Sequence, residues 1–139
     1  MEKLTFVLYR CARIIAALIL LQTLYFKFSG SEESVYIFTT VGMEPVGRIG
    51  IGILEMIAAL LLIFNRSAWI GSGLALGLMT GAIGMHVTKL GISVQNDGGY
   101  LFFLAVAVAL CSIFILLRNK DKIFSIIRLM TEKTNTEVS

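Results

Sequence analysis

Several polar side chains lie within stretches of this sequence that are otherwise apolar. Glu55 is the clearest case, because it follows Val46 by nine residues, or about 13 Å along a helix. An ionisable group in hydrocarbon costs about 2.5–3.5 kcal/mol, so it indicates either a function or a specific partner. Glu55 is therefore expected to be protonated or buried against a partner. The candidate ligand-binding residues are Gln22, Lys27, Arg48, Glu55, His86 and Lys89.

The spacing of these residues predicts one polar pocket. Arg48 and Glu55 are seven residues apart and share a helix face. His86 and Lys89 are three apart and share a face of a later helix. With Gln22 near the end of the first apolar stretch, these residues are expected to surround a pocket in one half of a helical bundle, with Glu55 at its floor.

Each candidate also has a purely structural interpretation. Lys27 and Lys89 can extend to lipid headgroups, and His86 can form a hydrogen bond between helices. Asp97, which precedes Gly98 and Gly99, is favoured as the amino-terminal cap of the last apolar helix. For Glu55 the alternative is a structural pairing with Arg48 or His86.

The sequence argues against metal, thiol and nucleotide chemistry. It contains one histidine and two distant cysteines, Cys11 and Cys111, so neither a zinc site nor a CxxC redox pair is expected. The two cysteines are predicted to be small, buried apolar residues. No catalytic residue is assigned, and the net charge of +3 indicates membrane orientation and not binding of nucleic acid.

Composition and hydropathy predict the elements that carry these residues. Hydrophobic residues make up 57% of the 139 and charged residues 15%, whereas soluble domains average about 45–50% and about 25%. Apolar stretches of about 20 residues predict membrane-spanning helices. The predicted fold is all-α, a four-transmembrane-helix bundle over residues 1–118. The expected spans are about 6–28, 46–64, 68–90 and 99–117.

Basic residues predict the orientation of the bundle. With the amino terminus in the cytoplasm, nine of the twelve Lys and Arg residues lie on that side, and Lys27, Arg48 and Lys89 lie on the other. Four spans then place both termini in the cytoplasm. The expected location is the bacterial cytoplasmic membrane, and the lipid bilayer is the first expected partner.

The connecting segments predict two further helices. Ser29–Glu32 has the spacing of a capping box, which predicts a short interfacial helix over Glu32–Val41 on the outer side. Residues 119–139 are expected outside the bilayer on the cytoplasmic side. Asn119–Met130 is predicted to be an amphipathic helix near anionic headgroups, and Thr131–Ser139 a disordered tail.

A glycine series marks the third span. Gly73, Gly77 and Gly81 recur every four residues, and Gly84 lies on the same face. Small residues at this spacing allow close helix contacts within a membrane. Packing within the bundle is the favoured interpretation, and a homodimer through the Gly73/Gly77/Gly81 face is the alternative.

Over residues 5–118 the chain resembles the DoxX-like family of small four-helix membrane proteins. The matching motifs are Phe26–Gly30, Gly52–Glu55, Ala68–Gly71, His86 and Asp97–Gly99. The resemblance implies that Lys27, Glu55 and His86 form the polar signature of the family. The family name comes from a subunit associated with a thiosulfate:quinone oxidoreductase, and some relatives look like assembly factors.

Three functions therefore remain open. The favoured prediction is an accessory protein that binds a small amphipathic ligand, a quinone or a lipid, in the polar pocket. The second is a membrane subunit of a quinone-linked oxidoreductase, whose membrane or soluble redox partner supplies electrons. The third is an assembly factor or chaperone for another membrane protein. Whether the chain is an enzyme is left open, and no cofactor is evident apart from a bound quinone or lipid.

Overall fold

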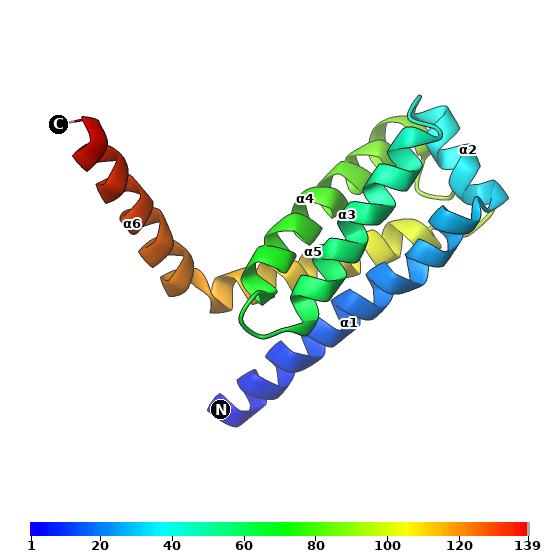
Figure 1. Cartoon of the computed structure of the whole chain (residues 1–139). Helices are drawn as coiled ribbons and strands as arrows, with labels where there is room; N and C mark the ends of the chain where they lie inside the picture. The colour runs from blue at the N-terminus through cyan, green and yellow to red at the C-terminus, as the bar shows by residue number, and fades with distance from the viewer. Residues whose placement is uncertain (139) are drawn as a thin grey trace.

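The computed structural model describes residues 1–138, which form helices and no strands (Figure 1). The helices are α1 (Glu2–Ser29), α2 (Glu32–Thr40), α3 (Val46–Ile63), α4 (Ala68–Met85), the π-helical turn η1 (His86–Leu90), α5 (Tyr100–Arg118) and α6 (Lys120–Val138).

Four helical segments within residues 1–138 are long and apolar enough to cross a membrane, as the sequence predicted. They are α1, α3, α4 continued by η1, and α5, and their ends lie within a few residues of the predicted ones. Large apolar side chains on their outer faces, such as Leu18, Phe103 and Leu110, are more than 60% exposed. A surface of this kind is typical of helices that face lipid.

The four long helices form a ring in which each packs against two neighbours. α1 and α4 lie diagonally opposite each other, and both contact α3 and α5. Alanine dominates the buried contacts, with Ala16, Ala58, Ala59 and Ala75 fully buried. Small side chains allow the close backbone approach on which association of helices in lipid depends.

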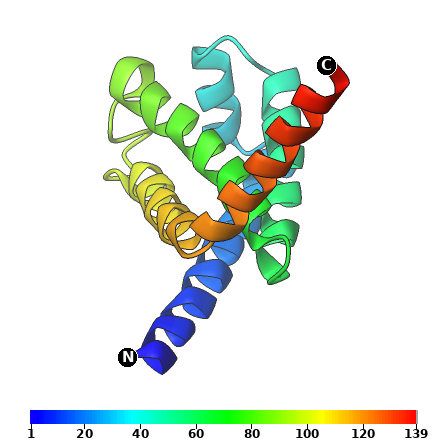
Figure 2. The same cartoon turned by 90° about the vertical axis from the view of Figure 1, so that its left-hand side faces the viewer.

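The two ends of the bundle differ. The short helix α2 covers one end together with the α4–α5 connection, and α6 leaves from the other end and runs across the direction of the bundle (Figures 1 and 2). We call these the α2 end and the α6 end. The amino terminus and the α3–α4 loop lie at the α6 end (Figure 1).

Both connecting helices differ in detail from the prediction. The amino-terminal cap of α2 is Ser31, whose hydroxyl accepts a hydrogen bond from the Ser34 amide, whereas Ser29 still belongs to α1. α6 does not end at Met130 but continues to Val138, so the predicted disordered tail is helical as far as the structure describes it. Residues 131–138 contain no glycine or proline to end the helix.

The predicted packing of the α4 glycines within the bundle is wrong. A Cβ atom added at Gly73, Gly77, Gly81 or Gly84 would meet no atom of residues 1–138 within 4 Å, so no neighbouring helix packs on this face. The close contact of α4 is made by Gly71. A Cβ atom there would lie 2.8 Å from Leu61 Cβ and 2.9 Å from the Ala58 carbonyl oxygen of α3.

We therefore expect Gly71→Ala to destabilise the fold and Gly73→Ala to be neutral or slightly stabilising. The methyl group at position 71 meets backbone that cannot yield, which costs about 1–3 kcal/mol. At position 73 it enters open space and favours the helix. Unfolding in mixed detergent micelles measures both variants, and equal stabilities would contradict this account of the α3–α4 contact.

Arg13, which the sequence placed among the flanking cations, is buried inside the bundle at the α6 end. Its Nε donates to the Leu62 carbonyl at 2.9 Å, and one terminal nitrogen donates to Asn65 Oδ1 at 3.2 Å. The other terminal nitrogen donates to the Ile63 carbonyl. The last carbonyls of a helix lack partners within it, so this guanidinium completes the carboxyl end of α3.

Arg13→Ala is expected to lower the free energy of unfolding by about 2–4 kcal/mol, because it leaves buried carbonyls without a donor. Arg10 provides the control, since it is exposed and its guanidinium lies over the Phe6 ring. Arg10→Ala is expected to cost less than about 1 kcal/mol. Similar losses in the two variants would show that the Arg13 contacts are not what holds this end of the bundle.

Candidate functional site

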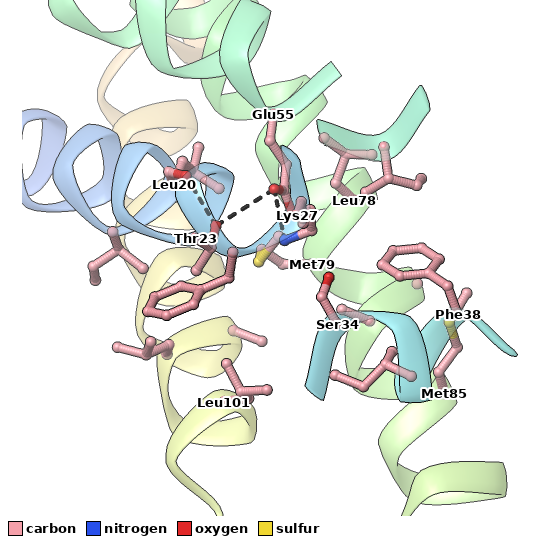
Figure 3. A pocket seen from close by; sticks show the side chains of 18 of the residues that line it. Leu20, Thr23, Lys27, Ser34, Phe38, Glu55, Leu78, Met79, Met85 and Leu101 are labelled. Carbon is pink, nitrogen blue, oxygen red and sulfur yellow. Dashed lines mark hydrogen bonds and ion pairs between the residues drawn. The ribbon is translucent and has the colours of Figure 1, made fainter. Parts of the chain in front are cut away.

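A cavity of about 330 Å³ lies at the α2 end, within the ring of long helices (Figure 3). Residues of α1, α2, α3, α4 and α5 line it, and most of them are apolar, including Leu20, Phe38 and Met79. The volume is at the lower end of the range of about 300–1,000 Å³ that small-molecule pockets occupy. A largely apolar cavity between bundle helices with a few polar groups is a common form of ligand site.

An ion pair forms part of the cavity wall. Lys27 Nζ of α1 lies 2.9 Å from Glu55 Oε2 of α3, and the two side chains are 16% and 4% exposed (Figure 3). The Thr23 hydroxyl lies 3.4 Å from the same carboxylate oxygen and 2.9 Å from the Leu20 carbonyl, so its single proton is donated to one of the two. Glu55 is thus buried against a partner, which is one of the two states that the sequence predicted for it.

The ion pair leaves hydrogen-bonding capacity unused. Within residues 1–138, Glu55 Oε1 accepts no hydrogen bond, and the Lys27 ammonium has Glu55 as its one partner. An ammonium group carries three donor hydrogens and an ionised carboxylate has two acceptor oxygens. Both residues line the cavity, so the unused donors and the unused acceptor lie beside each other at its wall.

Local sequence features bring Lys27 and Glu55 together. Gly52, one turn before Glu55, has no side chain to separate α3 from α1, and a Cβ atom there would lie 2.9 Å from the Phe28 ring. Lys27 lies in the last turn of α1, where a cation is favoured by the helix dipole. Gly30 follows with a φ of 66°, which ends α1 and turns the chain into α2.

Three of the six predicted site residues line the cavity: Gln22, Lys27 and Glu55. Gln22 Nε2 donates to the Tyr100 hydroxyl at 3.2 Å, which links α1 to α5. Arg48, His86 and Lys89 are not among the lining residues that the structure describes. The predicted single pocket with all six side chains is therefore not formed.

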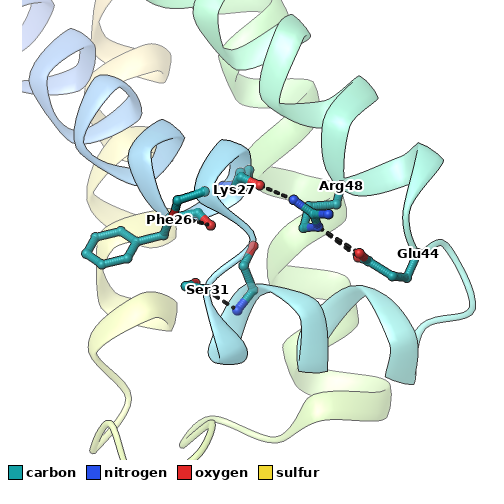
Figure 4. Close-up of polar contacts among 7 residues, drawn as sticks. Phe26, Lys27, Ser31, Glu44 and Arg48 are labelled. Atoms are coloured by element: carbon teal, nitrogen blue, oxygen red, sulfur yellow. Dashed lines mark hydrogen bonds and ion pairs between the residues drawn. The ribbon is translucent and has the colours of Figure 1, made fainter.

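Arg48 has a structural role beside the cavity (Figure 4). Its Nε lies 2.9 Å from Glu44 Oε1, and a terminal nitrogen donates to the backbone carbonyl of Lys27. The predicted pairing of Glu55 with Arg48 is wrong, because Glu44 is one helical turn from Arg48 and occupies its guanidinium. Through the Lys27 carbonyl, Arg48 fixes the end of α1 from which the Lys27 side chain extends.

His86 is buried at the start of η1 and does not pair with Glu55. Its Nδ1 lies 2.9 Å from the Gly91 carbonyl, which can only accept, so this nitrogen carries the proton. Its ring meets Phe102 edge to face, with centroids 5.8 Å apart. Lys89 on the same turn is exposed. The predicted hydrogen bond of His86 between two helices is wrong, because the bond that His86 forms closes the end of its own helix.

The Asp97 side chain caps the start of α5, as predicted, but from two residues before Gly99, which occupies the amino-terminal cap position. Its Oδ1 accepts from the amides of Val94 and Gly99 at 2.9 and 2.8 Å, and its Oδ2 accepts from Leu101 at 3.2 Å. Burial acts to raise the pKa of Asp97, but these three hydrogen bonds, together with His86, hold it below its usual range.

α2 contributes a part of the site that sequence reasoning missed. Ser34, Phe38 and the partly buried Glu33 line the cavity from this helix. Burial, and then the negative charge of Asp97, raises the pKa of Glu33. A capping-box spacing predicted a short helix here at the outer interface, but no sequence signal showed which of its residues turn toward the bundle.

The cysteines lie in the other half of the molecule. Cys11 of α1 and Cys111 of α5 belong to the halves of their helices nearer the α6 end, away from the cavity. Cys111 is half-buried, but Cys11 is exposed on the outer face, so the prediction that both are buried is wrong for Cys11. An exposed apolar thiol is compatible with a helix face that meets lipid.

Comparison of the chain with protein-family models, with curated proteins and with solved structures gave no match. The likeness to the DoxX-like family therefore rests on the sequence motifs, and membership stays a prediction.

The ion pair gives a direct test of how Lys27 and Glu55 depend on each other. Removing one partner of a buried pair leaves an unpaired charge, so Lys27→Met and Glu55→Gln are each expected to cost about 3–5 kcal/mol of stability. The double variant is expected to lose less than the sum of the two. Glu44→Gln is expected to cost less, about 1 kcal/mol, because the glutamine oxygen still accepts from Arg48, whose guanidinium also keeps its bond to the Lys27 carbonyl. Strictly additive losses for Lys27 and Glu55 would contradict the pairing.

Proposed function

We propose that this chain is an integral membrane protein that binds a small amphipathic molecule, a quinone or a lipid, in the cavity beside Lys27 and Glu55. The observation that carries the proposal is the ion pair with unused donors and an unused acceptor in the wall of a mostly apolar cavity. Both groups line the cavity, so a polar head group there can form the bonds that the pair leaves open.

The chemistry of the wall limits the class of ligand. A carbonyl or phosphate oxygen can accept from the Lys27 ammonium, and a hydroxyl group can donate to Glu55 Oε1. The apolar surface around Leu20, Phe38 and Met79 suits a ring or a hydrocarbon chain. Quinones and lipids both combine a hydrogen-bonding head with an apolar remainder, and this agrees with the accessory role expected from the resemblance to the DoxX-like family.

The distribution of basic residues supports an orientation. Nine of the twelve Lys and Arg residues belong to the α6 end or to α6 itself, which supports placing this end in the cytoplasm and the α2 end outside. α6 runs across the direction of the bundle, as a helix on a bilayer surface would (Figure 1). Its Lys120, Lys122 and Arg128 are then near anionic headgroups. The ligand cavity opens in the outer half of a bacterial cytoplasmic membrane.

Mass spectrometry of the protein purified in mild detergent tests the proposal. A quinone or lipid is expected to co-purify with the wild-type protein and to be reduced about tenfold in Glu55→Gln, which removes the carboxylate charge beside Lys27. Glu44→Gln is the matched control, since this carboxylate is also paired with a cation but does not line the cavity. A wild-type protein without any bound amphiphile, or equal retention in both variants, would refute the function.

A further inference from the structure

The exposed residues of the cavity lining mark where the cavity reaches the surface. Among the lining residues that the structure describes, five are exposed: Gln22, Phe26, Gly77, Gly81 and Tyr100. Gln22 and Phe26 belong to α1 and Tyr100 to the start of α5, whereas the two glycines belong to α4. The cavity therefore approaches the surface at two separate places.

The two places are closed to different degrees. On the α1–α5 side, the hydrogen bond between Gln22 Nε2 and the Tyr100 hydroxyl spans the two helices, and Phe26 follows one turn after Gln22 on α1. On the α4 side, Gly77 and Gly81 present bare backbone. A Cβ atom at either glycine would meet no atom of residues 1–138 within 4 Å.

The α4 opening faces hydrocarbon and not water. Gly77 and Gly81 lie 9 and 13 residues after Ala68 in the 23-residue span Ala68–Leu90, or about 14 and 20 Å along the helix. A bilayer has about 30 Å of hydrocarbon, so Gly77 lies near its centre and Gly81 between the centre and the outer boundary. A molecule that reaches the glycines has already dissolved in the membrane.

The volume of the cavity also points to an opening for a chain. About 330 Å³ accommodates a ring or a short segment of hydrocarbon, but it does not hold a whole membrane lipid or a long-chain quinone. If the polar head lies at Lys27 and Glu55, the rest of a long chain must leave the cavity. At the α4 opening the helix presents only backbone, so a hydrocarbon chain can pass there without meeting a side chain.

We propose that the ligand is a long-chain amphiphile dissolved in the bilayer, which enters sideways past Gly77 and Gly81 and leaves its chain in that opening. The inference rests on the proposed function, because it assigns the class of ligand and the route to the same cavity. It also gives Gly77 and Gly81 a role that differs from a dimer contact. Gly73 and Gly84 lie on the same exposed face but do not line the cavity.

Two photoreactive probes test the route and separate the two sources of ligand. Wild-type protein in phosphatidylcholine nanodiscs is labelled with palmitic acid that carries a mid-chain diazirine, or with a decyl quinone that carries the same group. Labelling of α4 and α5 peptides that contain the lining residues Leu78, Met85 and Leu104 is then quantified by mass spectrometry. Preference for one probe identifies the head group that the cavity accepts.

Paired leucine variants locate the opening. Gly77→Leu with Gly81→Leu is expected to reduce labelling of the cavity about tenfold, because leucine side chains cover the bare backbone. Gly73→Leu with Gly84→Leu adds the same side chains to the same face and is expected to change labelling less than about twofold. A dimer contact along this face would respond equally to both pairs. Gly77→Ala with Gly81→Ala adds only two methyl groups to the opening, so an intermediate loss of cavity labelling is expected.

The outcomes separate the route from the function. Cavity labelling in the wild type that is unchanged by the Gly77 and Gly81 variants would overturn the route and leave the proposed function standing. Equal loss with both leucine pairs would assign the face to a dimer instead. No cavity labelling of the wild type by either probe would overturn the route and count against the proposed function as well.

Discussion

The buried ion pair of Lys27 and Glu55 is the constraint on which the α2 end of this bundle depends. Two charges among apolar helices are tolerated only when they are paired, so α1 and α3 must keep their relative depth and rotation. Gly52 permits the necessary approach, and the Arg48 guanidinium holds the Lys27 carbonyl at the end of α1. The cavity lies beside this contact because α4 and α5 complete the ring and α2 covers its end.

The sequence predicted the helices well and the contacts between them poorly. The membrane-spanning helices follow from the length of each apolar segment, which is a property of that segment alone. The contact of Asp97 with the start of α5 was also predictable, because it joins residues that are close in the sequence. The partner of Glu55 was not predictable in this way. Arg48 shares its helix face, yet Glu44 lies one turn from Arg48 and takes its guanidinium, while the true partner comes from α1. Such a choice depends on how two helices are rotated against each other.

Other differences have the same origin. The burial of Arg13 depends on the packing of α1 against the carboxyl end of α3, where the Leu62 and Ile63 carbonyls lie, and no pattern within α1 indicates this. The glycine spacing of α4 correctly marked a face without side chains, but spacing does not say whether a neighbour covers that face. Gly71, outside the series, makes the close contact with α3 because it lies beside the tight loop that joins the two helices.

The two buried cations differ in how completely the fold occupies their nitrogen atoms. The Arg13 guanidinium directs each of its three nitrogens at an acceptor of residues 62–65, so every nitrogen has a partner within the fold. The Lys27 ammonium and Glu55 Oε1 keep unused capacity at the wall of an apolar cavity. A buried ion pair contributes little net stability compared with apolar side chains of the same volume. Stability alone therefore does not account for an incompletely bonded pair at this position, and this is the reason for our proposal that the pair binds a polar head group.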